Sequence, residues 1–346
     1  MAGESWAREW MEDLAAVWGA RPYEQYGCTQ RALAWNCPAG AVPDGRRGVL
    51  HTLPDHGLYE VVDPSSGKPA VPGEFGELVF TPFFANLSPL VRFATGDGEV
   101  GLTFPAFWAM SMRRHMLEYG TRREQVAMVA VKTRRNGVKN DRAQFRKAID
   151  LKEALDSRLV CDPIRVYDCC PATDGAAAVV LGPAEGAGPR AVDLLASVQT
   201  TGRARMSDYD ELTFFPATVE AARRAYTEAG ISPSDLDVVE LHDCFTMAEI
   251  VDGEDLGLVE KGEGGRAVEA GVTDFGGRVV VNPSGGLLSK GHPVGATGCG
   301  QIFEVVRQLR GEHPNQVSGA RIGLTHNAGG TQALVSVHVL QGRSSA

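Results

Sequence analysis

An imidazole and a thiol lie two positions apart in the middle of the chain, in the tetrapeptide His242-Asp243-Cys244-Phe245. The preceding run, LDVVEL, is short and apolar, and it predicts a buried strand that delivers polar residues at its C-terminal end. If the strand continues, the side chains of His242 and Cys244 lie on the same face. A histidine that donates a hydrogen bond and a cysteine that can ionise are the parts of an acid–base pair, so this motif favours catalysis over a structural role.

A second histidine, His292, lies in the glycine-rich run NPSGGLLSKGHPVGATG, residues 282–298. The glycines allow the backbone to approach a ligand closely. We expect a helix over 292–310, with Pro293 early and Gly311 just past its end, so His292 lies near free backbone N–H groups. The helix dipole at that end disfavours a charged imidazolium, and His292 is therefore expected to be neutral and able to accept a proton.

Two further motifs carry less information by themselves. His326-Asn327-Ala328-Gly329-Gly330 places two glycines after a polar pair, a pattern that can form a pocket of backbone N–H groups for an oxyanion. Taken alone, a simple hairpin turn is the better interpretation of it. The stretch YDCCPATDGAAAVV combines an Asp-Gly turn with an alanine run, and it favours structural packing over catalysis.

Alternating strands and helices over 190–340 must position these residues, and they imply a layered α/β fold. Within that region we expect a helix over 217–229, followed by a glycine that ends it. The last run, RIGLTHNAGGTQALVSVHVL, predicts two strands around a glycine turn. Upstream, a helix is expected over 105–119, followed by a capping box of Thr121 and Glu124 that begins the next helix.

The first hundred residues differ in composition from the rest. Four of the five tryptophans precede residue 36, whereas 19 of the 41 glycines lie between Gly253 and Gly330. Trp6 and Trp10 recur at helical spacing in an amphipathic helix expected over 4–18. The short runs LYEVVDP, GELVF and PLVRF, each followed by turn residues, then predict a β-rich segment of about 80 residues.

Length and composition limit the class of protein. With 346 residues, 43% apolar and 22% charged, the chain can bury a large core and lies in the globular range. A net charge of −9 without a basic stripe argues against nucleic acid or an anionic membrane surface as a partner. We find no apolar run that could span a bilayer and no signal pattern at the N-terminus. Seven cysteines without zinc-ligand spacing then indicate a reduced, cytoplasmic protein without a metal site.

From about Phe104 to the end, the chain resembles the thiolase superfamily, specifically the sterol-carrier-protein-2-type thiolases. The resemblance rests on REQVAMVAVK, DCCP with DGAAA, LDVVELHDCF, NPSGGLLSKGHPVGATG and THNAGG, in this order and spacing. It implies two α/β halves of similar topology stacked as five layers, usually in a dimer. It also implies formation or cleavage of a carbon–carbon bond in acyl-CoA thioesters through an enzyme thioester, with coenzyme A thioester as substrate and no tightly bound cofactor.

The resemblance implies roles for individual residues. His292 matches the base, and His242 matches the group that helps hold the thioester oxygen. Cys244 matches the second acid–base thiol, because the HNAGG turn lacks the cysteine that biosynthetic thiolases carry there. Further positions match residues that line the site and its second oxyanion pocket, namely His326, Asn327, Gly329 and Gly330. Three others match residues that contact coenzyme A: Ser284, Gly285 and Gly286.

The nucleophilic cysteine of the family belongs to the N-terminal half, in a small-residue motif before a buried helix. Cys28 and Cys37, the cysteines before Phe104, lack that context. We therefore expect either that a companion chain supplies the nucleophile or that this chain is catalytically impaired. The expected partner is a second copy of this chain, a companion thiolase or an OB-fold subunit. Two alternatives stay open: a retro-aldol carbon–carbon lyase without an acyl-enzyme, which often works with an OB-fold subunit, and a non-catalytic acyl-CoA-binding subunit.

Residues from about 10 to 100 resemble an adenylate-forming ligase of the phenylacetate–CoA ligase type. The resemblance rests on YGCTQ, YEVVDPSSGKPAVPGEFGELVF and SPLVRFATGD. It implies adenylate contacts at Tyr26 and Thr29 and a ribose contact at Asp97, but Gln30 replaces the glutamate that binds the metal. An inherited β-rich scaffold without ATP chemistry is favoured.

Together these resemblances predict three parts. Residues 1–100 form the ligase-like fragment, residues 101–190 form a loop region and remnant of the thiolase N-terminal half, and residues 191–346 form the thiolase C-terminal domain.

Overall fold

The computed structural model describes residues 103–203 and 209–343, together with six strands before residue 103. The chain separates into two compact units, Met1–Thr103 and Phe104–Ala346, and each is described by itself. The helix expected over 4–18 lies outside the described residues. So do Thr29 and Asp97 of the ligase-like motifs.

The described part of the first unit is two antiparallel sheets of three strands each. Their strands are β1 (Gln25–Cys28), β2 (Arg31–Asn36), β3 (Leu50–Thr52), β4 (Gly57–Val62), β5 (Glu77–Pro82) and β6 (Phe93–Ala94). The strands expected at LYEVVDP and GELVF are confirmed as β4 and β5, and Phe93, the last residue of PLVRF, begins β6. Tyr26 lies in β1, opposite Ala34 of β2.

The second unit is built around a five-stranded mixed sheet in the order β11-β10-β12-β13-β9. Strand β10 runs parallel to β11 and β12, while β12, β13 and β9 alternate in direction. The strands are β9 (Val192–Thr201), β10 (Val238–Glu240), β11 (Val280–Val281), β12 (Ile322–Gly329) and β13 (Leu334–Gly342). The mixed α/β class is confirmed, and β12 and β13 are the two strands expected around a glycine turn.

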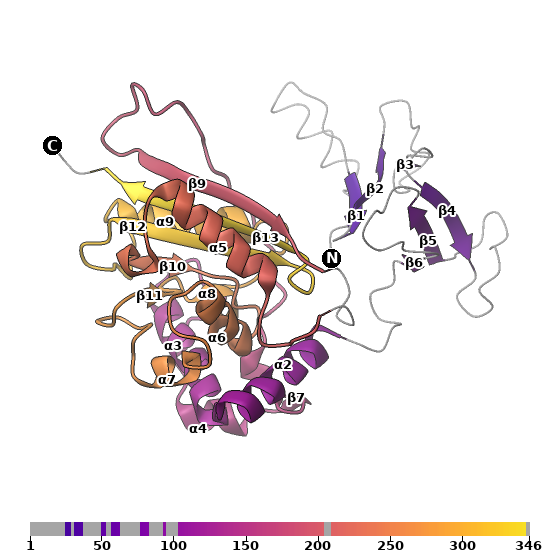
Figure 1. Cartoon of the computed structure of the whole chain (residues 1–346), viewed down its shortest axis with the longest axis horizontal. Helices are drawn as coiled ribbons and strands as arrows, with labels where there is room; N and C mark the ends of the chain where they lie inside the picture. The colour runs from indigo at the N-terminus through magenta and orange to yellow at the C-terminus, as the bar shows by residue number, and fades with distance from the viewer. Residues whose placement is uncertain are drawn as a thin grey trace. The chain divides into compact units, whose positions relative to one another are not determined.

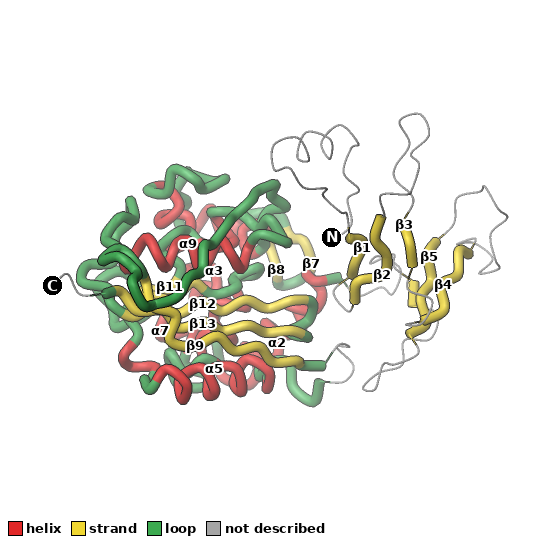
Figure 2. The backbone as a smooth tube through the Cα atoms, turned by 90° about the horizontal axis from the view of Figure 1, so that it is seen from above, coloured by secondary structure: helices red, strands yellow, loops and turns green. Residues whose placement is uncertain are grey.

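Two helices cover opposite faces of this sheet. Helix α5 (Pro216–Ala229) packs on β9 and β13, and α9 (Thr297–Leu309) packs on β12 and β10. Figure 2 shows the sheet between them. Because side chains alternate along a strand, Leu324 and Ala328 of β12 enter the core under α5. Gly323 faces α9 instead, where a Cβ atom would lie 2.5 Å from Val305.

The remaining elements form a helical layer below the sheet (Figure 1). They are α2 (Phe104–Tyr119), α3 (Arg123–Val138), α4 (Leu151–Asp156), β7 (Leu159–Cys161), β8 (Ile164–Arg165), the 3-10 turn Val166–Asp168, α6 (Thr246–Asp255), α7 (Gly264–Glu269) and α8 (Gly286–Ser289). An aromatic cluster joins them: the ring of Trp108 lies 5.8 Å from Phe215 and 6.2 Å from Phe245. A second 3-10 turn, Pro233–Asp235, connects α5 to β10. Of the helices in the described ranges, none is both long and apolar enough to cross a membrane.

Helix ends set by glycine follow the sequence closely. Gly120 and Gly230 adopt the left-handed conformation, with φ of 72° and 67°, directly after α2 and α5. The capping box expected at Thr121 and Glu124 is wrong by one residue. The Arg122 N–H donates to the Gln125 side chain at 2.9 Å, because the Thr121 hydroxyl is already bonded to the buried ring of His115 at 2.8 Å.

The helix expected from His292 begins five residues later, at Thr297. His292 instead forms a bridge to Ala172, and a turn closed by Ala296 N–H on the Pro293 carbonyl precedes the helix. The strand expected to carry His242 and Cys244 ends at Glu240. The Leu241 N–H bonds the Asn282 side chain at 2.9 Å and Asp243 N–H turns back to the Leu241 carbonyl, so the ladder cannot continue.

The fold requires glycine at position 286, where φ is 57° and a Cβ atom would overlap the Asp243 carboxylate. We expect Gly286→Ala to destabilise the protein by at least about 2 kcal/mol, since the left-handed backbone and the clash both cost energy. Gly300→Ala is the matched control, because that helical position has open space. Urea unfolding measures both, and equal stabilities would contradict the packing described here.

Candidate active site

Two histidines from different parts of the chain meet at one end of the sheet. The ring centroids of His242 and His292 lie 5.0 Å apart, with the ring planes at 88°. His242 follows β10, and His292 lies on the connection between α8 and α9. Polar residues that follow the carboxyl end of a parallel strand are a common basis for a site, and these two are the candidates that the sequence favours most.

The proton on His292 is placed by Thr297. The Thr297 hydroxyl donates to the Pro293 carbonyl at 3.0 Å, so its oxygen must accept from His292 Nδ1–H, 2.7 Å away. The Nε2 atom of His292 therefore keeps its lone pair. The backbone N–H of His292 donates to the Thr173 hydroxyl oxygen at 3.0 Å, and this bond holds the main chain beside the imidazole ring.

The proton on His242 lies on the opposite type of nitrogen. Its Nδ1 accepts a hydrogen bond of 3.1 Å from the Asn327 amide nitrogen, so the neutral ring carries its proton on Nε2. This contact follows from the strand register, since Glu240 of β10 pairs with Thr325 of β12 and the next two residues keep the chains side by side. The pair thus combines one proton acceptor and one hydrogen-bond donor.

Both rings are held neutral by their surroundings. Burial lowers the pKa of His242 well below its ordinary value, and the neighbouring His292 and His326 lower it further. Burial also lowers the pKa of His292. The expected neutrality of His292 therefore arises from desolvation, because the ring lies ahead of the helix rather than in its first turn.

The thiol of Cys244 packs against the apolar cluster of Phe107, Trp108 and Phe245. Its backbone carbonyl accepts from Cys170 N–H at 3.0 Å. Burial raises the pKa of Cys244 well above its ordinary value, and the nearby Cys170 adds to the effect. The group is therefore a neutral thiol that keeps its proton at neutral pH. Within the described residues, no hydrogen bond joins the Cys244 thiol to His242 or His292.

Asn327 and His326 point to opposite faces of β12. Asn327 lies on the α9 face, whereas the His326 ring is buried under α5 and its Nε2 lies 3.3 Å from the Thr218 hydroxyl. The structure therefore places His326 behind the site rather than on its lining. Gly329 shares the face of Asn327 by alternation, and Gly330 is exposed in the following turn with φ of 63°.

The segment Ser284, Gly285 and Gly286 is fully buried. The Ser284 hydroxyl and backbone N–H donate to the Glu240 carboxylate at 2.7 and 3.0 Å, and Gly285 packs against the backbone of Gly137. These residues are therefore brought under the histidine pair as a support. All three are covered by other described residues and are not exposed to solvent.

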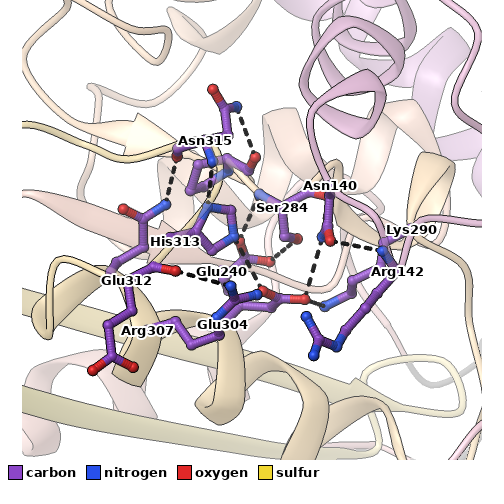
Figure 3. A network of polar contacts seen from close by, with 12 residues as sticks. Asn140, Arg142, Glu240, Ser284, Lys290, Glu304, Arg307, Glu312, His313 and Asn315 are labelled. Atoms are coloured by element: carbon purple, nitrogen blue, oxygen red, sulfur yellow. Dashed lines mark hydrogen bonds and ion pairs between the residues drawn. The ribbon is translucent and has the colours of Figure 1, made fainter.

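A polar network holds this support from the far side (Figure 3). Asn140 donates to the Ser284 carbonyl at 3.0 Å and to Glu304 at 3.3 Å. Glu304 also contacts the His313 ring at 3.1 Å and the Lys290 ammonium at 3.7 Å. Since Lys290 precedes His292 by two residues, the network anchors the connection that carries the site histidine.

Two residues that contribute to the site, Thr297 and Gln301, are not among the site residues predicted from the sequence, although Thr297 lies within the glycine-rich run 282–298. Thr297 and Gln301 lie one turn apart on α9; the first contacts His292, and the second contacts Asn327 at 3.1 Å. Their i, i+4 spacing could identify a shared helix face, but only the fold shows that the face meets the histidines. Within residues 103–203 and 209–343, no group of His, Cys, Asp and Glu side chains is placed to hold a metal ion.

Several known proteins have sequences similar to this chain. Residues 198–342 match the family model described as "Thiolase C-terminal domain-like". An acetyl-CoA acetyltransferase of Methanothermobacter thermautotrophicus is 44% identical over 316 residues, which cover 90% of this chain and 77% of that protein. Sterol carrier protein 2 of Oryctolagus cuniculus is 42% identical over 246 residues, 68% of this chain but only 45% of that one.

Among solved structures, one described as "Ltp2-ChsH2(DUF35) aldolase" is similar with a TM-score of 0.63 and 27% sequence identity, covering 71% of this chain and 65% of that chain. The match to the acetyltransferase extends well into the residues before Phe104, since it covers 90% of this chain. The ligase resemblance of those residues stays a prediction.

Burial of His326 predicts a pH-dependent stability. Burial lowers its pKa to about 3, whereas an unfolded histidine binds a proton near pH 6.5. As the pH falls from 6 to 4, the unfolded chain alone gains this proton, so the wild type should lose up to about 1.4 kcal/mol per pH unit relative to His326→Asn.

Urea unfolding at pH 8, 7.5, 6, 5 and 4 measures the difference between the two proteins. It should be constant between pH 7.5 and 8, where neither state titrates at this position. A difference that is also constant between pH 6 and 4 would contradict the buried neutral ring.

Proposed function

The chain belongs to the thiolase family, and we propose that its second unit carries the acid–base half of a site that forms or cleaves a carbon–carbon bond in acyl-CoA thioesters. The family is one of acyltransferases, and thiolase-type acyl-CoA chemistry is what membership supports. The observation that carries the proposal is the His242–His292 pair with protons on opposite types of nitrogen.

In this proposal His292 is the base. Its free Nε2 takes the proton of a cysteine thiol, which then attacks the acyl carbonyl. His242 directs its Nε2–H to the thioester oxygen, where negative charge develops in the transition state. Backbone N–H groups at Gly329 and Gly330 donate hydrogen bonds to the second oxyanion. Asn327 takes part in the site through its hydrogen bond to His242.

Cys244 is the second acid–base group, which moves a proton at the α-carbon of the substrate. A thiol with a raised pKa is a proton donor at neutral pH, and it becomes a base only when the site stabilises its thiolate. Ser284, Gly285 and Gly286 are buried, so they could contact coenzyme A only if the residues that cover them moved away. In the proposal they act first as the support beneath His292.

The nucleophile comes from a companion chain. Burial raises the pKa of Cys169 and Cys170 to about 12, which makes both poor nucleophiles. The description of one solved relative, "Ltp2-ChsH2(DUF35) aldolase", names two components. We propose the same kind of arrangement here, with either a thiolase chain or an OB-fold subunit as the companion.

Three further parts of the proposal concern the environment of the chain. The cysteines of the described ranges are free thiols, which fits a reduced, cytoplasmic protein. Coenzyme A thioester enters as substrate, with no tightly bound cofactor. Residues 1–100 act as a β-rich scaffold, and ATP–pyrophosphate exchange above background would contradict this.

A second function, retro-aldol cleavage, is favoured by one specific observation. The solved relative that is 27% identical is described as an aldolase. The same histidines and Cys244 could move protons without an acyl-enzyme. Release of an aldehyde or ketone from 3-hydroxyacyl-CoA would support this function, and its absence would remove it.

Turnover tests the leading proposal. The chain, alone and together with a companion that carries the thiolase N-terminal half, is given acetyl-CoA or a 3-ketoacyl-CoA with coenzyme A. We expect turnover only with the companion, and His292→Ala should lower the rate at least about 100-fold because the base is lost. Release or consumption of coenzyme A is measured.

His338→Ala is the matched control, since that ring is bonded to Ser197 on the sheet and should leave the rate unchanged. Equal zero rates for wild type and His292→Ala without the companion exclude independent catalysis. Equal zero rates with it exclude the acyltransferase proposal, and coenzyme A affinity by calorimetry then identifies a binding subunit.

A further inference from the structure

We propose that Gln301 is a positioning residue that sets which nitrogen of His242 carries the proton. The inference rests on the proposed function, because it concerns the histidine that would hold the thioester oxygen. Gln301 does not touch His242 itself. It acts through Asn327, by way of three consecutive hydrogen bonds.

The first bond orients the Gln301 amide. Gln301 lies on α9 and is 0% exposed, so it has no water to choose instead of protein partners. Its Nε2 donates to the His326 backbone carbonyl at 2.9 Å. A carbonyl oxygen can only accept, so the amide nitrogen must face it and the amide oxygen must point the other way.

The second bond passes this orientation to Asn327. The Gln301 Oε1 atom accepts from Asn327 Nδ2 at 3.1 Å. Turning the Asn327 amide over would place its oxygen against the oxygen of Gln301, two acceptors without a proton between them. Because Gln301 is buried and Asn327 is half-buried, such a pair of facing acceptors is costly, so the Asn327 nitrogen stays on this side.

The third bond selects the tautomer. The Asn327 nitrogen has two protons, one for Gln301 and one for His242 Nδ1 at 3.1 Å. His242 Nδ1 must therefore be an acceptor, and the ring proton stays on Nε2. Because the anchor of the series is a main-chain carbonyl of β12, the position of this proton is fixed by the backbone through two amide side chains.

The test observes the imidazole nitrogens of the substrate-free protein by long-range proton–nitrogen NMR. In the wild type we expect His242 with its proton on Nε2 alone. Gln301→Met keeps the side-chain length but cannot orient Asn327, so signals of the Nδ1–H form should appear. Gln301→Leu is a second variant in case the first does not fold, and Asn327→Asp, which can only accept from Nδ1–H, calibrates the signal of the inverted ring.

His313 is an internal control, because its Nδ1 accepts from the backbone N–H of Asn315 at 3.0 Å and its tautomer should be the same in every variant. A folded Gln301→Met or Gln301→Leu protein in which His242 keeps only the Nε2–H form would overturn the proposal. Since the NMR test needs no turnover, failure of this inference and failure of the proposed function are separate results.

Where turnover is obtained, the same variants should lower kcat by up to about 100-fold, the cost of one lost oxyanion donor, with little change in KM. A merely structural role of Gln301 would lower stability without moving the tautomer.

Discussion

Parallel pairing of β10 with β12 sets Glu240 opposite Thr325, where β10 ends while β12 continues to Gly329. Two residues further on, this register places His242 beside Asn327. A shift of the register by one residue would turn Asn327 to the α5 face and bring the ring of His326 to the histidine pair instead. The tautomer of His242, the access of Gln301 to Asn327 and the donor role of Nε2 all depend on this one alignment.

The support beneath the site is polar and buried, which is unusual for a core. Glu240, Asp243 and Glu249 are all buried, and desolvation raises the pKa of each. Glu249 is paired with the Lys132 ammonium and Glu240 with Ser284, so most of these groups have partners. Removing Lys132 would leave the buried Glu249 carboxylate without its counter-charge, at a cost of about 3–5 kcal/mol. The loop that carries His292 is therefore tied to specific geometry rather than to general apolar packing.

Desolvation also sets the protonation state of each titratable group in the site. It keeps both histidines neutral, so that one can accept a proton while the other donates a hydrogen bond. The same effect makes the thiol of Cys244 a weak acid. Groups with these properties can move protons at a substrate but cannot begin a covalent step, which is the physical reason for looking to a companion chain for the nucleophile.

The sequence by itself determined the features that depend on neighbouring residues: the α/β class and the helix ends at Gly120 and Gly230. It also predicted His242 and His292 as site residues. Local conformational limits and residue chemistry suffice for these. Only the tertiary structure decided that His326 faces α5, that Ser284 bonds Glu240, and that Gln301 reaches Asn327. Such contacts join residues far apart in the chain, and the alternation of a strand shows which residues share a face without showing what covers it.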